Sequence, residues 1–409
     1  MNYVPYVANP NMNILLVSSK YMPEYSGSGY RAHNLYKRLT ASNPDMRVNV
    51  VAGSETENIC ANYEYDGFKV RRISCKPFPD AGRGLLRVLK ISLNFHSEYV
   101  AATEHIRTLP SPDLIHIFGK NYVTAAALNY ARSHGIPAII ELCNEMDTPL
   151  HYIPVANRFE ASNRLPDKYH FICISERLRN VCLKNNIPES NLWCRPNPVD
   201  ESRFKPVNKE VSSSLRRKLS KFSDDDIVVT AIASFIPRKN HRLLVEAARL
   251  LPEQYKIFLA GPIVESGPLT NRASSIFDDL VRTVAKHNLE KRVQLTNGFI
   301  ENIEEYYQMS DLFAFPSLSE GLGTPVLESI ACGIPVVANR IEGVTDVWIK
   351  DGVNGYLSAL TPSGFAEKII LASSLSLDKR KLGSENMLKV AGTESIDRAY
   401  AALINKCLS

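Results

Sequence analysis

Residues 311–357, DLFAFPSLSEGLGTPVLESIACGIPVVANRIEGVTDVWIKDGVNGYL, contain the pattern that decides the fold. Two short apolar runs, Leu312–Pro316 and Pro335–Asn339, have the length and composition of strands buried in a parallel sheet. Between them a glycine-bearing loop opens a segment of helical length, which we expect Thr324 to cap and Gly333 to end. The stretch therefore predicts a strand–helix–strand unit of an α/β protein.

The same alternation of strand-like runs and helical segments extends over the chain of 409 residues. The other predicted strands are Asn13–Ser19, Arg47–Gly53, Lys69–Ser74, Leu114–Phe118, Pro137–Leu142, His170–Ile174, Ile227–Ser234, Lys256–Ala260, Val293–Thr296 and Gly355–Ser358. One core rarely grows beyond about 250–300 residues, so two doubly wound domains are expected. The first domain is predicted over residues 1–197 and the second over 198–394. A closing helix at about 395–409 is expected to pack back near the first domain.

Composition excludes several classes of protein. Hydrophobic residues make up 44% of the chain and charged residues 22%, which is typical of globular proteins and not of disordered or fibrous chains. The sequence has no apolar run long enough to span a membrane and no recognisable secretory signal, so we expect a cytoplasmic protein. The eight cysteines form no CxxC pair and no zinc-type cluster with histidine, which predicts free thiols.

Positive charge is concentrated in the first half of the chain. Residues 1–198 contain 22 Lys and Arg against 17 Asp and Glu, whereas residues 199–409 contain 26 of each kind. A basic first domain suggests an anionic partner such as a membrane surface or an acidic acceptor. Chance variation of the surface charge is the alternative.

The loop Ser319–Thr324 joins a predicted parallel strand to a predicted helix. Glycines at such a point let a ligand approach the backbone, and the N-terminus of the helix favours an anion such as a phosphate. Glu320 and Glu328 would repel a phosphate, so we expect them to accept hydrogen bonds from sugar hydroxyls. A plain helix cap with two surface glutamates is the alternative.

This block resembles the E-x7-E signature of retaining glycosyltransferases of family 4, and here it reads Glu320-GLGTPVL-Glu328. That family has a B-type fold, in which two Rossmann-like domains face a cleft. Further segments similar to the family's motifs are Ser26–Gly29, Asp113–His116, Ser175–Glu176, Cys194–Asp200, Phe204–Pro206, Pro237–Asn240 and Asp351–Gly355. The resemblance implies transfer of a hexose-type sugar from a nucleoside-diphosphate sugar, with retention at the anomeric carbon.

The resemblance also implies roles for single residues. Lys239 and Glu320 would be catalytic, because Lys239 neutralises the diphosphate and Glu320 binds sugar hydroxyls. Glu328 would bind the ribose. The other residues implied in donor binding are Gly27, Gly29, Arg238, Phe299, Gly321, Leu322, Gly323 and Thr324. His116 and Asn144 are candidate sugar contacts, and a buried core histidine is the alternative for His116.

The implied partners are the nucleotide-sugar donor and a glycan or lipid-linked acceptor, in surface polysaccharide or glycolipid synthesis. Neither a metal ion nor another cofactor is expected, and nucleic acid is not an expected partner. Arg83, Arg87 and Lys90 would share one helical face, which suggests peripheral contact with an anionic membrane at its inner face. An ordinary domain helix with solvated cations is the alternative.

Three positions depart from the family's pattern. Ser234 stands where the family has an arginine, the stretch 141–145 lacks the family's histidine, and Ser28-Gly29 replaces a double glycine. These departures keep two other interpretations open. One is a sugar-nucleotide epimerase of the same fold, and the other is a catalytically weakened sugar-nucleotide binder.

Overall fold

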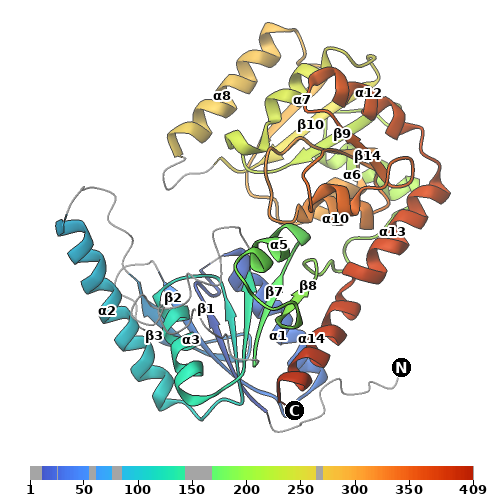
Figure 1. The fold of residues 1–409 in the computed structure, drawn as a ribbon. Coiled ribbons are helices and arrows are strands. Elements are labelled where there is room, and N and C mark those ends of the chain that lie inside the picture. The colour runs from blue at the N-terminus through green and yellow to red at the C-terminus, as the bar shows by residue number, and fades with distance from the viewer. Residues whose placement is uncertain are drawn as a thin grey trace. The chain divides into compact units, whose positions relative to one another are not determined.

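The computed structural model describes residues 12–24, 26–54, 61–75, 85–142, 168–263 and 270–408 (Figure 1). The side chains of residues 85–95 and 270–274 are not part of that description. The chain divides into two compact units, Met1–Arg195 with Ile396–Ser409 and Pro196–Ser395. The divisions expected from the sequence were 197/198 and 394/395.

The first unit is built on a sheet with eight strands among the described residues, in the order β3-β4-β2-β1-β5-β6-β7-β8. Every neighbouring pair is parallel except β3 with β4. The strands are β1 (Asn13–Ser18), β2 (Arg47–Ser54), β3 (Ala61–Tyr65), β4 (Phe68–Ser74), β5 (Leu114–Phe118), β6 (Ala138–Leu142), β7 (Tyr169–Cys173) and β8 (Leu192–Cys194). The described helices are α1 (Gly27–Ser42), α2 (Leu85–Thr108), α3 (Tyr122–His134), α5 (Glu176–Lys184), the short η3 (Glu189–Asn191) and α14 (Thr393–Leu408).

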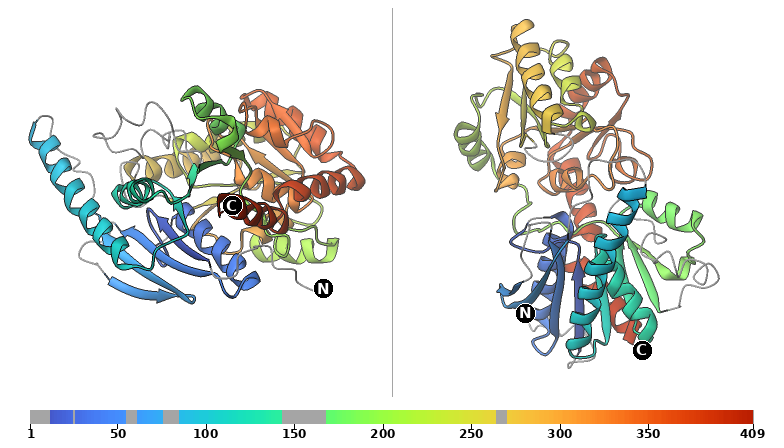
Figure 2. Two further views of the ribbon diagram at one scale, coloured as in Figure 1. Left: turned by 60° about the horizontal axis from the view of Figure 1, so that its bottom comes forward. Right: turned by 90° about the vertical axis from the view of Figure 1, so that its left-hand side faces the viewer.

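Helices cover both faces of this sheet, because alternate residues of its buried strands point to opposite sides. On one face, Ile14 and Leu16 of β1 pack in a cluster with Leu35 of α1 and with Ile396 and Ile404 of α14. On the other face, α3 contacts β1, β2 and β5, and α2 lies beside α3 (Figure 2). The closing helix of the chain is therefore part of the core of the first unit.

The second unit contains a parallel sheet with six described strands, in the order β11-β10-β9-β12-β13-β14. They are β9 (Ile227–Ile232), β10 (Tyr255–Gly261), β11 (Val293–Asn297), β12 (Leu312–Phe315), β13 (Val336–Asn339) and β14 (Gly355–Ser358). The described helices are α6 (Lys209–Leu219), the short η4 (Pro237–Lys239), α7 (His241–Ala248), α8 (Thr270–Lys286), α9 (Ile303–Gln308), α10 (Thr324–Ala331), α11 (Thr345–Trp348), α12 (Pro362–Ser373) and α13 (Leu377–Ala391).

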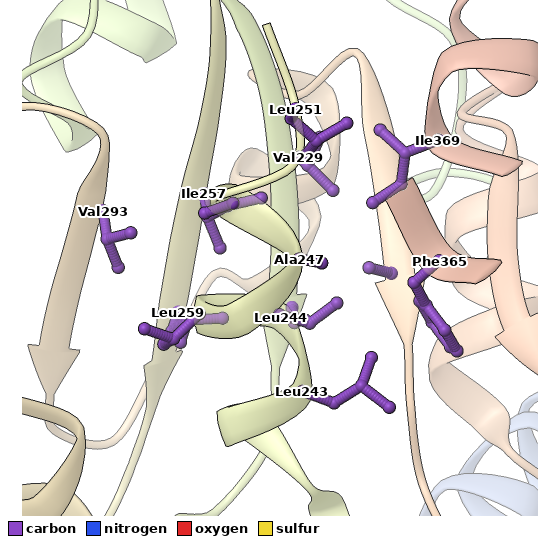
Figure 3. Close-up of a cluster of buried hydrophobic side chains, with 14 of the residues drawn as sticks. Val229, Leu243, Leu244, Ala247, Leu251, Ile257, Leu259, Val293, Phe365 and Ile369 are labelled. Carbon is purple, nitrogen blue, oxygen red and sulfur yellow. The ribbon is translucent and has the colours of Figure 1, made fainter. Parts of the chain in front are cut away.

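The core of the second unit also has two sides. Val229 of β9 and Ile257 of β10 pack under Leu244 of α7 and Phe365 of α12, as the cluster in Figure 3 shows. The alternate strand residues Val228, Phe258 and Ala260 turn to the other face, where side chains of α6 and α9 join them. Both sheets are thus doubly wound, and the predicted fold class is confirmed.

All twelve predicted strands are present, and two further strands were not predicted. β3 is an antiparallel strand at the edge of its sheet, with a half-exposed surface, and β8 has three residues. Neither has the apolar run by which a strand buried in a parallel sheet is recognised in a sequence.

A buried carboxylate ties four parts of the first unit together. Glu141 of β6 is fully buried and accepts hydrogen bonds from Arg195 Nη2 at 2.9 Å to each of its oxygens. The Tyr400 hydroxyl of α14 and the ring of His116 of β5 also contact Glu141 Oε1. Burial alone would raise the pKa of Glu141, but Arg195 and His116 outweigh it and hold the pKa below its usual value. The carboxylate is therefore charged and paired.

His116 belongs to this network. Its side chain is fully buried, and burial lowers its pKa, so the ring is neutral. Because a carboxylate only accepts, His116 Nε2–H donates to Glu141, and Nδ1 accepts from the Tyr36 hydroxyl at 2.8 Å. Both ring nitrogens are occupied by the protein itself. This geometry favours the core-histidine alternative over a sugar contact.

We predict that Arg195→Met lowers the free energy of unfolding by about 3–5 kcal/mol, because it leaves the buried Glu141 carboxylate without its cation. Urea unfolding measures the effect. The matched control is Arg179→Met, because Arg179 pairs with exposed Glu189 and should cost less than about 1 kcal/mol. The double variant Arg195→Met/Glu141→Gln should recover part of the loss, and a double variant as unstable as the single one would contradict this role.

Candidate functional site

The candidate site lies where the strand order of the second sheet reverses. From β9 the chain first adds β10 and β11 on one side, and then β12, β13 and β14 on the other. β9 and β12 are therefore neighbours, with Val229 opposite Leu312 and Thr230 opposite Phe313. The loops that follow parallel strands diverge at such a point, which is where ligands bind in open α/β sheets.

Two loops meet at this point. The loop after β9 contains η4, with Arg238 and Lys239, and the loop after β12 leads through Glu320 into α10. A backbone hydrogen bond of 2.9 Å from Leu318 N–H to the Arg238 carbonyl joins the two loops. The pairing of β9 with β12 therefore brings together residues that are 81 positions apart in the sequence.

Glu320 is held between two cations. Lys239 Nζ lies 2.6 Å from Glu320 Oε1, and Arg238 Nη1 lies 2.8 Å from Glu320 Oε2. Arg238 also donates to the Ser319 carbonyl at 2.6 Å. Only 14% of the Lys239 side chain and 11% of the Glu320 side chain are exposed, against 44% for Arg238. The sequence predicted these three residues as one site, and the fold brings their charged groups into contact.

The pKa values of Glu320 and Lys239 depend on burial and on the charged neighbours of each group. Burial raises the pKa of Glu320, but Lys239, Ser317 and Arg238 outweigh it, so the pKa lies below its usual value. Burial lowers the pKa of Lys239, and the attraction of Glu320 opposes that shift. Nζ also lies 5.5 Å from the centroid of the Phe315 ring. The site thus contains a largely buried carboxylate that is ionised at neutral pH.

The start of α10 differs from the prediction. Gly323, not Thr324, is the N-cap, with φ +74 and ψ +47, and no side-chain cap bond is made there. A side chain at residue 323 would need a left-handed backbone, which favours glycine, whereas its contact with the Phe315 ring at 3.4 Å would be ordinary packing. The Thr324 hydroxyl instead accepts from Asn197 Nδ2 at 3.1 Å. Leu322 is buried, so only its backbone can serve a ligand.

Glu328 lies one turn into α10 and has a different environment. The Tyr307 hydroxyl, which is fully buried, donates to Glu328 Oε2 at 3.0 Å. Burial raises the pKa of Glu328 to about 7, although Tyr307 and Arg203 act in the opposite direction. Glu328 therefore changes its charge near neutral pH, whereas Glu320 does not.

Phe299 lies on the same edge of the sheet, after β11. Its side chain is 72% exposed, which is unusual for a phenylalanine. Gly298 before it has φ +147 and donates its N–H to the Gly261 carbonyl at 3.1 Å. A side chain at Gly261 would lie 2.1 Å from the Ala233 carbonyl oxygen. Glycines thus let the loops after β9, β10 and β11 approach one another and present Phe299 to solvent.

Gly321 lies between Glu320 and Leu322 in the loop before α10, and the remaining predicted residues belong to the first unit. Gly29 is explained by packing, because a side chain there would lie 2.4 Å from the Lys20 carbonyl oxygen. Gly27 at the start of α1 has open space around its Cβ position, so a ligand can approach the backbone there. Asn144 lies outside the described residues. The roles of Gly27, Gly29 and Asn144 in donor binding stay predictions.

Sequence reasoning missed several residues that support the site. Tyr307 holds Glu328, Asn197 holds Thr324, and Ser317 helps to keep Glu320 ionised. His241, which follows the Lys239 loop, is buried, and burial lowers its pKa to about 4. Tyr307 and Ser317 belong to no charged or glycine-rich pattern, so only the three-dimensional contacts identify them. Asn197 lies in the segment Cys194–Asp200, which had no single-residue role assigned to it. No group of three or more metal-ligating side chains occurs among the described residues.

Part of the chain is similar to known glycosyltransferases. Residues 213–389, which include Lys239, Glu320 and Glu328, match the family model described as glycosyl transferases group 1. The putative glycosyltransferase EpsD of Bacillus subtilis (strain 168) is 31% identical over 188 residues, which are 46% of either chain. An Escherichia coli UDP-Gal:α-D-GlcNAc-diphosphoundecaprenol α-1,3-galactosyltransferase is 28% identical over 195 residues, 46% of this chain and 47% of that protein. The matched segments thus span about half the length of these relatives.

Similar solved structures extend over both units. A crystal structure of Anabaena HepE in complex with UDP and glucose superposes with a TM-score of 0.70 at 19% identity, covering 97% of this chain and 100% of the other. The sucrose-phosphate synthase of Thermosynechococcus elongatus gives a TM-score of 0.72 at 18% identity, covering 97% and 98%. At such identities the likeness establishes the fold, which is the B-type glycosyltransferase fold of two Rossmann-like domains.

We predict that Glu328→Gln stabilises the protein at alkaline pH. A folded pKa of about 7, against an ordinary 4.5, means that ionisation is easier in the unfolded chain and costs stability as the pH rises through this range. At pH 8 the free energy of unfolding of the variant should exceed that of the wild type by roughly 1–3 kcal/mol. At pH 5 the gain should shrink to a fraction of that value.

Urea unfolding at the two pH values tests this prediction. The control is Glu367→Gln, because 65% of the Glu367 side chain is exposed and its replacement should change the free energy of unfolding little. Equal destabilisation of Glu328→Gln at both pH values would identify Glu328 as an ordinary structural carboxylate.

Proposed function

We propose that this protein is a retaining glycosyltransferase that moves a hexose-type sugar from a nucleoside-diphosphate sugar to a glycan or lipid-linked acceptor. The observation that carries the proposal is the contact of Lys239 and Arg238 with Glu320 at the switch point of the second sheet. The family model over residues 213–389 supports glycosyl transfer. Surface polysaccharide or glycolipid synthesis is the proposed context, in keeping with the printed names of relatives such as the lipopolysaccharide core glycosyltransferase LpsE of Rhizobium meliloti.

Each charged group has a proposed role toward the donor. Lys239 and Arg238 bind the diphosphate, and the backbone of residues 321–324 at the start of α10 adds N–H donors and the positive end of the helix. Glu320 accepts hydrogen bonds from sugar hydroxyls. Glu328 accepts from the ribose hydroxyls, and the exposed ring of Phe299 lies beside the base. Arg238 thereby supplies a second cation. In the family that cation is an arginine at the position that Ser234 occupies here.

Catalysis then depends on charge and position. The bond from the anomeric carbon to the phosphate oxygen breaks, and its electron pair leaves with the nucleoside diphosphate. Lys239, Arg238 and the start of α10 stabilise this developing negative charge. The acceptor hydroxyl attacks the oxocarbenium-like carbon from the same face, and its proton passes to a phosphate oxygen of the leaving group. Retention follows from that geometry, and the main task of the protein is positioning.

The first unit is proposed to bind the acceptor. Gly27, the first residue of α1, has open space at its Cβ position and stays a predicted donor contact. The predicted basic helix forms part of α2, but Arg83 and the side chains of Arg87 and Lys90 lie outside the description, so membrane contact stays a prediction. Among the described helices none has the length and apolar composition to cross a membrane.

We predict that Glu320→Ala reduces sugar transfer by at least about 100-fold and leaves the fold intact, because it removes sugar contacts at a site that is not part of the hydrophobic core. A thermal-shift screen of nucleoside-diphosphate sugars first identifies the donor, since ligand binding to the native state raises its apparent stability. Product analysis with that donor then measures transfer. The matched control is Glu305→Ala, which removes a glutamate that pairs with the exposed Lys218. Wild-type transfer by folded Glu320→Ala protein would refute the site.

Sugar transfer should also persist in excess EDTA. Lys239, Arg238 and the N-terminus of α10 are proposed to compensate the negative charge of the diphosphate without a metal ion. Initial rates with and without chelator measure this. Loss of transfer on chelation with recovery on addition of Mg²⁺ or Mn²⁺ would require a different account of leaving-group stabilisation.

A further inference from the structure

The two cations of the site already have a partner within the protein. Glu320 contacts Lys239 Nζ at 2.6 Å and Arg238 Nη1 at 2.8 Å, one through each carboxylate oxygen. The carboxylate therefore neutralises part of the positive charge that a diphosphate would bind, and the two cations lie against the oxygens that sugar hydroxyls would approach. The proposed roles of Glu320 and of the cations compete with one another in this arrangement.

The arrangement is fixed by the backbone, so only side chains can change it. Leu318 N–H donates to the Arg238 carbonyl at 2.9 Å, which holds the two loops together. Arg238 has a second acceptor in the Ser319 carbonyl at 2.6 Å and a side chain that is 44% exposed. Lys239 is more sheltered, with Phe315 beside its ammonium group. A ligand can thus compete for the charged groups while the loops stay in place.

We propose that Glu320 acts as an internal counter-ion: it occupies Lys239 and Arg238 when no donor is bound, leaves them for the sugar hydroxyls when the intact donor binds, and returns to them after transfer. This inference rests on the proposed function. Its consequence is selectivity between donor and product. The intact donor supplies both a diphosphate for the cations and hydroxyls for the carboxylate, whereas the product nucleotide supplies the diphosphate alone and faces an uncompensated carboxylate.

The counter-ion therefore promotes release of the product. After the sugar has left, the carboxylate has lost its hydroxyl partners, and it competes with the diphosphate for the two cations and repels its charge. A structural ion pair would behave differently. If Glu320 only held Lys239 in place, its removal would disorder Lys239 and weaken the binding of every anion at this site.

The test compares the affinity of inorganic diphosphate for the wild type, Glu320→Gln and the matched control Glu305→Gln by calorimetry. The amide keeps the shape of the glutamate and removes its charge. We expect Glu320→Gln to bind inorganic diphosphate about fivefold or more tightly than the wild type. Glu305→Gln, which faces Lys218 on the surface, should match the wild type. The double variant Glu320→Gln/Lys239→Met should lose most of the gain, which assigns it to Lys239.

Affinity that is unchanged or weaker in Glu320→Gln overturns the inference, and so does an absence of diphosphate binding in both proteins. A gain that survives in the double variant overturns it as well. If Glu320→Gln fails to fold, Glu320→Asp serves instead, because the shorter carboxylate cannot keep both contacts and should give a smaller gain of the same sign.

A transfer assay separates this inference from the proposed function. Tighter diphosphate binding by Glu320→Gln without any transfer by the wild type would remove the proposed function and keep the counter-ion. Transfer by the wild type without tighter diphosphate binding by Glu320→Gln would keep the proposed function and remove the counter-ion.

Discussion

The parallel pairing of β9 with β12 is the constraint on which the site depends. It places the carboxyl ends of two strands side by side at the point where the order of the sheet reverses, so their loops start together and lead in opposite directions. The backbone hydrogen bond from Leu318 N–H to the Arg238 carbonyl then fixes the distance between the loops. Lys239 and Glu320 are consequently neighbours by topology, although they are 81 positions apart in the sequence.

The buried carboxylates of the two units differ in how far the protein itself supplies their hydrogen-bond partners. In the first unit, Glu141 is surrounded by Arg195, His116 and Tyr400, and the protein itself satisfies it. Such a network fixes the closing helix to the sheet and leaves nothing for a ligand. In the second unit, Glu328 has one hydroxyl partner in Tyr307 and a pKa raised by burial, so its ionised form is costly in the absence of a ligand. A carboxylate kept at such a cost is typical of a functional position.

The sequence predicted those features that depend on local patterns of residues, and it did not predict contacts between distant segments. The buried strands are recognisable because a strand covered on both faces must be apolar throughout, and all twelve runs were found on that ground. The edge strand β3, Ala61–Tyr65, has no such requirement and was missed. Lys239, Glu320 and Glu328 were predicted as site residues because each lies in a short local motif, and their roles stay predictions. The contacts of Arg195 with Glu141 and of Tyr307 with Glu328 join distant segments through single side chains, and no local pattern records them. The same holds for the start of α10, where the left-handed conformation of Gly323 took the capping position expected of Thr324.

The two glutamates of the motif illustrate how one short segment produces two kinds of carboxylate. Glu320 lies in the loop, beside two cations that lower its pKa, and Glu328 lies in the helix, where burial raises its pKa to about 7. Environments that drive the pKa values of neighbouring groups apart allow them to do different chemistry at one pH. A group that is always ionised can exchange one charged partner for another without a proton, which suits the binding and release of a diphosphate. A group that titrates near neutrality couples ligand binding to the uptake or loss of a proton. The eight-residue spacing of the motif thus sets the chemistry of the site, because it places one carboxylate before the start of α10 and the other one turn inside it.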